Sequence, residues 1–391
     1  MTEPRQPGRP PLRFALVGCG VIGRQHAEAL RQLGDRAELA VAVDTVPDAA
    51  RRLADGFGVE AGTDVAAALR RPDIDAIAIC TPSGTHADLA VAAMQAGKHV
   101  VVEKPVDVTV AAAQRVLAAQ RSTGRKATVI SQHRFDASSR LVRDAVVDGR
   151  LGRLTSGVAS VAWWRTQAYY DSGEWRGTRR WDGGGAVMNQ SIHTVDLLVW
   201  MLGVPVEVFA VTAQLAHERI EVEDTCVATI RFAGGALGVV HATTAAFPGL
   251  TARLQIHGSH GSAVIDDDRL VYFSAAAANS DGPQYGAQGG DNQAPALLAA
   301  PPDGSAPAGS APAGSAPAGS APAGSGAPAA TAGSDPAALS DAHTAQYSDF
   351  VDAINEDRHP FVTVEHATTT LAVVTAMYTS AASGRPVRLS T

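Results

Sequence analysis

Three polar residues are spaced to share one face of a helix in the segment GGGAVMNQSIHTVDLLVWMLG, residues 183–203. They are Asn189, His193 and Asp196. A neighbouring apolar stripe predicts a mostly buried helix with one polar strip, and it consists of Met188, Ile192, Val195, Val199 and Leu202. A histidine, with an ordinary pKa of about 6.5, can accept or donate a proton near neutral pH. Two roles stay open for His193 at this point: a hydrogen-bonded core residue, or the acid/base of a catalytic site.

A second reactive group follows the apolar run HVVV, where Glu103, Lys104 and Pro105 end a predicted strand. Proline removes a hydrogen-bond donor and restricts the residue before it, so this step is a poor choice for structure alone. A lysine at such a strand end points toward the cleft, where its ammonium group can stabilise a developing alkoxide. Lysine and histidine together suit oxidation of a secondary alcohol, in which the hydroxyl proton is removed as hydride leaves.

A dinucleotide site is predicted from FALVGCGVIGRQHAEAL, which has GxGxxG spacing between a predicted strand and a predicted helix. Gly18 permits the tight turn, Gly20 allows the backbone to approach a pyrophosphate, and Gly23 allows close packing of the helix. Val21 and Ile22 open the helix, whose N-terminus would hold the anion.

Cofactor choice is predicted from Asp44, which ends the next strand, LAVAVD. Its carboxylate can accept hydrogen bonds from the ribose hydroxyls and would repel a 2′-phosphate, so NAD is favoured and NADP remains possible. The alternative is an aspartate that only caps the following turn.

Other residues are expected at the same cleft because ligands lie beyond the carboxyl ends of parallel strands. Thr81 and Pro82 end one strand in AICTPSGTHADLA, and Glu103 and Lys104 end the next, so all four are predicted cofactor contacts. His86 is either a further cofactor contact or a packing residue in the first turn of its helix.

A segment rich in aromatic and arginine residues, WWRTQAYYDSGEWRGTRRW at 163–181, precedes the glycine run. Aromatic faces and arginine forks suit carbohydrate and carboxylate ligands, so Tyr169, Tyr170, Trp175 and Arg176 are predicted substrate contacts. For the two leading tryptophans, an arm that packs against a partner subunit is an equal alternative.

The order of elements predicts an α/β protein: an N-terminal Rossmann domain, then a C-terminal α/β domain with an open, mainly antiparallel sheet. Residues 1–12 form a proline-rich leader, 13–135 the NAD(P)-binding domain and 136–391 the substrate and oligomerisation domain. An insert at about 275–338, with four SAPAG repeats at 305–324, is expected to be a disordered loop.

The composition of the chain limits the classes of partner that it can bind. A net charge of −7 without a basic stripe argues against nucleic acid, and no window of about twenty apolar residues predicts a membrane span. The cysteines Cys19, Cys80 and Cys226 lack metal or disulfide spacing, which fits a reducing cytoplasm. No metal is expected, since His257 and His260 in HGSHG lie in a glycine turn without further ligands.

Five motifs together resemble the glucose-fructose oxidoreductase / inositol dehydrogenase / rhizopine catabolism (Gfo/Idh/MocA) family: GCGVIG, TPSGTH, EKP, QHRF and GGG…NQSIH. The resemblance implies an NAD(P)-dependent dehydrogenase of sugars, sugar derivatives or cyclitols. It implies that Lys104 binds the reacting hydroxyl, that His193 is the general acid/base and that the peptide before Pro105 is cis. Arg134 of QHRF and Asn189 join the expected substrate contacts, and a dimer or tetramer through the C-terminal sheet is expected.

The chain departs from the commoner family pattern at Asn189, where many members have an aspartate. Asparagine keeps the hydrogen-bonding geometry but carries no charge, so a proton relay through this position is in doubt. Two other functions stay open: an NAD-dependent glycoside hydrolase or lyase with transient oxidation, and a non-catalytic sugar sensor on the same fold.

Overall fold

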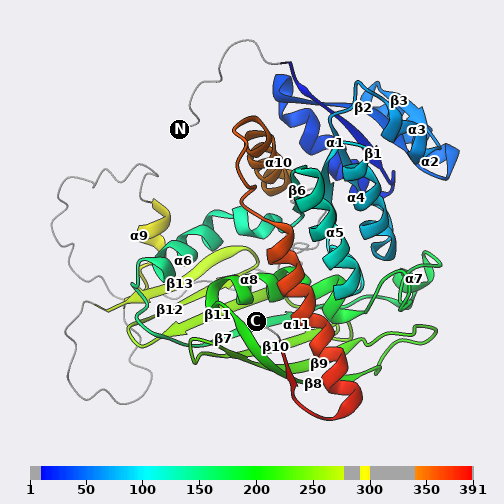
Figure 1. The fold of residues 1–391 in the computed structure, drawn as a ribbon. Helices are drawn as coiled ribbons and strands as arrows, with labels where there is room; N and C mark the ends of the chain where they lie inside the picture. The colour runs from blue at the N-terminus through cyan, green and yellow to red at the C-terminus, as the bar shows by residue number, and fades with distance from the viewer. Residues whose placement is uncertain (1–9, 277–290, 300–339, 390–391) are drawn as a thin grey trace, which may run out of the picture.

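A computed structural model of the chain describes residues 10–276, 291–299 and 340–389. Two β-sheets dominate it, one in the N-terminal part and one in the C-terminal part (Figure 1). Within these ranges no helix is both long and apolar enough to cross a membrane. The predicted leader lies outside the described residues up to position 9, and most of the predicted insert does as well.

The N-terminal sheet is entirely parallel, with strand order β3-β2-β1-β4-β5-β6. Its strands are β1 (Leu12–Val17), β2 (Ala37–Val43), β3 (Glu60–Gly62), β4 (Ala76–Ile79), β5 (His99–Val102) and β6 (Ala127–Val129). The intervening helices are α1 (Val21–Gln32), α2 (Pro47–Phe57), α3 (Val65–Arg70), α4 (His86–Gln95) and α5 (Val110–Thr123). Apart from the edge strand β3, the strands are mostly apolar because helices cover the sheet, and this arrangement confirms the predicted Rossmann fold.

The C-terminal sheet has the order β13-β12-β11-β7-β10-β9-β8-β14, and only the β10–β7 pair is parallel. Its strands are β7 (Leu154–Ala162), β8 (Pro205–Ala213), β9 (Thr225–Phe232), β10 (Leu237–Thr243), β11 (Ala252–Gly258), β12 (Gly261–Asp266), β13 (Arg269–Ala275) and β14 (Val387–Arg388). The remaining helices are α6 (Ala137–Val147), α7 (Gln167–Asp171), α8 (Ile192–Leu202), α9 (Ala294–Ala299), α10 (Ser340–Asn355) and α11 (Val364–Ser383). The predicted open, mainly antiparallel sheet is confirmed.

One face of this sheet is covered and the other is open. Helices α8 and α11 pack on the covered face (Figure 1), where residues such as Val208, Ile230 and Val240 are buried. Alternate residues along the same strands face outward, as the two-residue period of a strand requires. These outward residues include exposed apolar side chains: Phe209, Val211, Val227, Leu237 and Val239.

Two segments differ from the domain boundaries expected from the sequence. Helix α10, within the predicted second domain, packs against α1 of the Rossmann sheet, and its Tyr347 and Phe350 are buried in the same core as Phe14 (Figure 1). Residues 291–299 of the expected disordered insert form an ordered piece that ends in α9. The Asn292 side chain bridges the backbone of β13, and Ala294 is buried beside that strand, which explains the order.

The helix predicted after the glycine run does not begin as a regular α-helix. Residues Ala186–Ser191 form a π-helix, and α8 begins only at Ile192. A π-helix carries an extra residue per turn and often occurs at functional sites. The shared face expected for Asn189 and His193 is therefore set by two different helical geometries.

A buried ion pair joins α8 to the end of the Rossmann sheet. Arg134, in a 3₁₀ turn after β6, donates from Nε and Nη2 to both carboxylate oxygens of Asp196 at 2.7 and 2.8 Å. Thr370 of α11 donates to the same carboxylate at 2.8 Å. Arg134 is 2% exposed and Asp196 4%. Arg134 was expected to contact substrate, but this pairing instead uses its guanidinium to hold α8 and α11 in place.

Asp196→Ala should destabilise the fold strongly, because it leaves a buried guanidinium without its partner. Breaking such a pair costs about 3–5 kcal/mol of unfolding free energy, measured by urea unfolding followed by circular dichroism. The control is Asp48→Ala, which removes an exposed pair with Arg51 and should leave the unfolding midpoint unchanged. Equal midpoints for the two variants would contradict the role given to Arg134.

Candidate active site

The glycine loop between β1 and α1 has the shape of a pyrophosphate cradle. Gly18 has a φ of +99°, and a Cβ there would strike the Cys80 carbonyl, whereas a Cβ on Gly23 would strike the carbonyl of Gly18. A Cβ on Gly20 would meet nothing within 4 Å, so the loop is open at the position that a phosphate would approach. Val21 is 72% exposed at the start of α1, and Ile22 packs against the core. The turn at Gly18 and the close packing at Gly23 are as predicted, and the open space at Gly20 is compatible with its predicted contact to a pyrophosphate.

Asp44 lies beside this loop at the end of β2. One carboxylate oxygen accepts from the Cys19 backbone N–H at 2.8 Å, and the other accepts from Val46 at 2.9 Å. The second bond is the turn-capping contact considered from the sequence. Both oxygens keep lone pairs for a further donor, so the placement is compatible with a ribose as well.

Thr81 and His86 lie close together beyond the end of β4. Their contacts agree with only one of the two roles expected for His86. Thr81 and Thr85 share a hydrogen bond of 2.7 Å at the turn that contains Pro82. His86 is 1% exposed, and its ring nitrogens lie 2.7 Å from the Pro105 carbonyl and 2.8 Å from the Thr81 carbonyl. His86 thus links two strand ends, which supports its packing alternative over a cofactor contact.

Glu103 also turns away from the cleft. It is 5% exposed, accepts from the Lys104 backbone N–H at 2.9 Å, and lies 2.9 Å from Nε2 of His26 on α1. The hydroxyl of Tyr347 on α10 contacts Nδ1 of the same histidine at 2.7 Å. Burial raises the pKa of Glu103, but hydrogen bonds from His26 and His343 outweigh it and lower that pKa well below its usual range. Glu103, expected to contact the cofactor, therefore holds the backbone of Lys104 instead. His26, which positions Glu103, was not marked by any sequence motif.

Lys104 reaches across to the helix that follows the glycine run. Its Nζ donates to the backbone carbonyl of Asn189 at 2.8 Å and to the Asn189 side-chain oxygen at 3.2 Å. The Asn189 amide donates in turn to Asp182, which also accepts from the Gly177 N–H at 2.8 Å. Burial lowers the pKa of Lys104, while Glu103 and Asp182 raise it in part. The peptide between Lys104 and Pro105 is cis, as the resemblance implied.

Asp182 is a site residue that sequence reasoning missed. It is 2% exposed and stands directly before the glycine run, in WDGGG, without a motif to single it out. Its carboxylate accepts a hydrogen bond from the Asn189 amide and places a negative charge near Lys104. The aspartate that is commoner at position 189 would place this charge there directly.

His193 lines the same cavity as Lys104, together with Pro105, Ile192 and Asp196. It also lines a neighbouring cavity with His133, Trp163 and Gln190, and its ring centre lies 5.2 Å from that of His133. Burial lowers the pKa of His193 well below its usual value, and the positive charges of His133 and Lys104 add to the effect. A neutral imidazole and an ammonium group thus share one cavity.

Two groups of three side chains bring possible metal ligands together in the described part of the chain. One is His26, Glu103 and His343, and the other is His133, Asp136 and Asp268. In the second group His133 Nδ1 lies 2.8 Å from Asp136 and 3.2 Å from Asp268. Burial lowers the pKa of His133, but the two carboxylates outweigh it and raise the pKa to about 10. His133 is therefore an imidazolium beside His193.

The aromatic and arginine segment folds into a cluster around Tyr169. The Tyr169 hydroxyl accepts from Arg176 at 2.7 Å and from the Gln190 amide at 2.8 Å. Trp175 also contacts Arg176, with 4.5 Å between the guanidinium carbon and the ring centre. Tyr170, expected to bind substrate, is 5% exposed and bonds Thr244 at 2.9 Å, so it is a packing residue.

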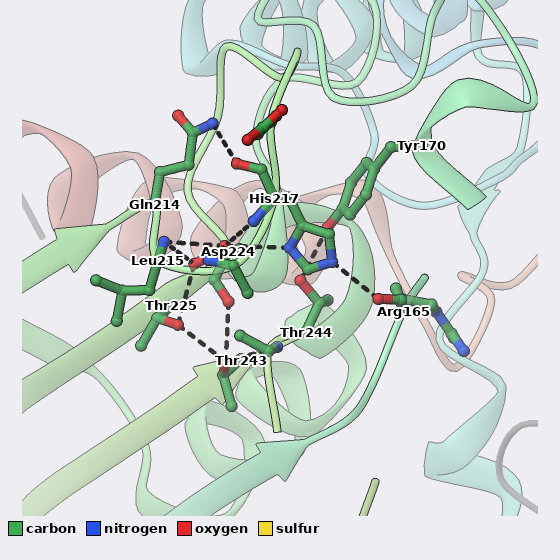
Figure 2. Close-up of polar contacts among 12 residues, drawn as sticks. Arg165, Tyr170, Gln214, Leu215, His217, Asp224, Thr225, Thr243 and Thr244 are labelled. Atoms are coloured by element: carbon green, nitrogen blue, oxygen red, sulfur yellow. Dashed lines mark hydrogen bonds and ion pairs between the residues drawn. The ribbon is translucent and has the colours of Figure 1, made fainter. Parts of the chain in front are cut away.

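Behind the cluster lies a buried polar network centred on Asp224 (Figure 2). Asp224 accepts from the backbone N–H groups of Leu215, Ala216 and His217 and lies 3.1 Å from the His217 ring. The other His217 ring nitrogen lies 2.8 Å from the carbonyl oxygen of Arg165. The network therefore fixes the backbone from which Arg165 extends.

The chain matches three family descriptions in order. Residues 12–131 match "Oxidoreductase family, NAD-binding Rossmann fold", residues 139–264 "GFO/IDH/MocA C-terminal domain" and residues 336–389 "Oxidoreductase family, C-terminal alpha/beta domain".

Similar proteins agree with these matches. Inositol 2-dehydrogenase of Rhizobium meliloti (strain 1021) is 32% identical over 269 residues, which cover 68% of this chain and 78% of that protein. The myo-inositol 2-dehydrogenase of Thermotoga maritima is 31% identical, over 66% and 76% of the two chains. The crystal structure of the WlbA dehydrogenase from Bordetella pertussis in complex with NADH and UDP-GlcNAcA is similar, with a TM-score of 0.78 and 31% identity over 97% of this chain and 99% of that one. This chain therefore belongs to the Gfo/Idh/MocA family of oxidoreductases and has its NAD-binding Rossmann fold.

Proposed function

We propose that the protein is an NAD-dependent dehydrogenase that acts on a hydroxyl group of a sugar, a sugar derivative or a cyclitol. One observation carries the proposal: Lys104 and His193 line one cavity, and Lys104 follows a strand whose carboxyl end shares a sheet edge with the glycine loop. The inositol dehydrogenases and the WlbA dehydrogenase among its relatives support the substrate class.

The two residues divide the chemistry of alcohol oxidation. Bound NAD supplies the hydride acceptor. Lys104 donates a hydrogen bond to the substrate hydroxyl and stabilises the negative charge that develops on its oxygen. His193 accepts the hydroxyl proton, for which its lowered pKa keeps it neutral and ready. In the reverse direction His193 returns that proton to the carbonyl oxygen.

The described surroundings support further parts of the proposal. Asp44 would accept hydrogen bonds from the adenosine ribose, and Gly20 with the start of α1 would hold the pyrophosphate. The open apolar face of the C-terminal sheet would pair with a second copy in a dimer or tetramer. Three free cysteines fit a reducing cytoplasm as the place of action.

His193→Ala should lower kcat by about 10²–10⁴-fold, because a positioned acid/base contributes that much to proton transfer. The measurement is NADH formation on a panel of sugars and cyclitols, with NADH affinity followed by fluorescence. Affinity for NADH should stay unchanged. His359→Ala, at an exposed histidine, is the matched control. A turnover number equal to that of the unmodified protein would remove His193 from the role.

The pH profile of kcat/KM should have its acidic midpoint below the ordinary histidine pKa of 6.5, because the pKa of His193 is lowered and the base works only when neutral. Its alkaline midpoint should lie below 10.5, because the pKa of Lys104 is also lowered and its positive charge is lost as pH rises. An acidic midpoint above 6.5 in a buffer series would contradict the assignment of the base.

Asp44→Asn should reduce the preference for NAD over NADP by about tenfold or more, because a hydrogen bond from ribose to a charged carboxylate contributes about that factor to binding. The asparagine removes the charge that repels a 2′-phosphate and keeps one oxygen acceptor, so one of the two N–H bonds from Cys19 and Val46 is lost. Ratios of kcat/KM for the two cofactors measure this, with Asp48→Asn as the control. An unchanged ratio would mean that another residue sets the preference.

A further inference from the structure

We infer that Arg165 and Arg176 form a carboxylate clamp on Tyr169, and that the substrate is therefore a sugar acid. The inference rests on the proposed function and narrows its substrate class. It starts from two positive side chains that the fold holds beside the cavity of His193 without giving them a negative partner.

The clamp is built around one aromatic ring. The guanidinium carbon of Arg176 lies 4.4 Å from the Tyr169 ring centre, and that of Arg165 lies 5.2 Å from it. Arg165 also donates to the Gln190 side chain at 3.0 Å and stacks over Trp163 at 5.0 Å. Cation–π contacts fix the direction of both forks but leave most of their N–H donors for a ligand.

Neither arginine has a carboxylate within 4.0 Å in the part of the chain that the structure describes. Arg134 and Arg71 do have one, Asp196 and Glu60 respectively, whereas the half-buried Arg143 donates instead to the Trp200 carbonyl and lies over the Trp200 ring. Asp182 interacts with Arg176 only at longer range, and its oxygens already accept from Gly177 and Asn189. Two partly desolvated cations are therefore left to be balanced by an anion from outside.

The backbone of Arg165 is held on both sides. Its N–H donates to the Thr244 carbonyl at 2.9 Å, and its own carbonyl meets His217, which Asp224 anchors. In Figure 2 the Arg165 side chain extends away from this network. Such a fixed origin preorganises the guanidinium, which lowers the entropy lost when it binds a ligand.

The neighbours of the clamp connect it to the reacting groups. Gln190, which binds Arg165 and Tyr169, lines the cavity with Trp163 and His193. The preceding residue, Asn189, holds Lys104. A carboxylate attached to a sugar ring lies within one ring of the hydroxyl that reacts. Planar carboxylates also match the arginine fork in a bidentate way.

The test compares matched acid and neutral ligands on the NADH-loaded protein: glucuronate with glucose, and UDP-N-acetylglucosaminuronate with UDP-N-acetylglucosamine. Isothermal titration gives their affinities, and NADH formation on the NAD-loaded protein gives kcat/KM. In each pair the acid should bind about tenfold tighter or more, as charge-assisted hydrogen bonds predict. Arg165→Gln and Arg176→Gln should each reduce the acid-to-neutral ratio by about that factor. Arg179→Gln, at an exposed arginine of the same segment, should leave the ratio unchanged.

The outcomes separate this inference from the proposed function. Equal affinities within both pairs would overturn the clamp, and turnover of the neutral sugars would still support a dehydrogenase. Tight binding of both nucleotide sugars alike, with no preference for glucuronate, would assign the arginines to the diphosphate and also overturn it. Preference for the acids without NADH formation would support the clamp and count against the dehydrogenase.

Discussion

The buried pair of Arg134 and Asp196 is the constraint on which the geometry of the cleft depends. Arg134 follows the last strand of the Rossmann sheet, and Asp196 lies on the helix that covers the second sheet. A bidentate contact between planar groups fixes distance and orientation together, and Thr370 ties α11 to the same point. Since His193 lies less than one turn before Asp196, the pair also sets how His193 faces the strand end that carries Lys104.

Charged side chains of both signs surround His193 and Lys104 in the cleft. Burial keeps His193 neutral and the nearby positive charges of His133 and Lys104 add to this effect, while Asp136 and Asp268 contact the imidazolium of His133 directly. Glu103 is held by His26 on the far side of the strand end, and Asp182 acts through an amide. Because Glu103 and Asp182 are buried and hydrogen-bonded, the positive charge of Lys104 acts on whatever occupies the cavity with little screening from solvent.

The sequence allowed the fold to be predicted, and also the two residues, Lys104 and His193, that line one cavity, because both depend on local patterns. Alternating apolar runs and helical periods identified the parallel sheet, and the glycine spacing identified the cradle, whose backbone geometry follows directly from residue type. Contacts between distant segments could not be predicted in this way. Arg134, Tyr170 and Glu103 are polar groups near motifs, and only the packing shows that each is used inside the protein. His26 and Arg165 matter through neighbours far away in the chain, whereas Asp182 acts through the nearby Asn189 and has no motif to mark it.

The π-helix of Ala186–Ser191 has an evolutionary consequence. It contains one residue more than an α-helical turn would need, so deletion of a single residue could restore a regular helix without disturbing α8. That deletion would rotate Asn189 by about 100° around the helix axis, away from Lys104, while the buried anchor at Asp196 stayed in register. In this fold the gain or loss of one residue can thus reshape the contacts of the lysine more sharply than a substitution, although the buried side chains of Ala186, Val187 and Met188 would have to repack.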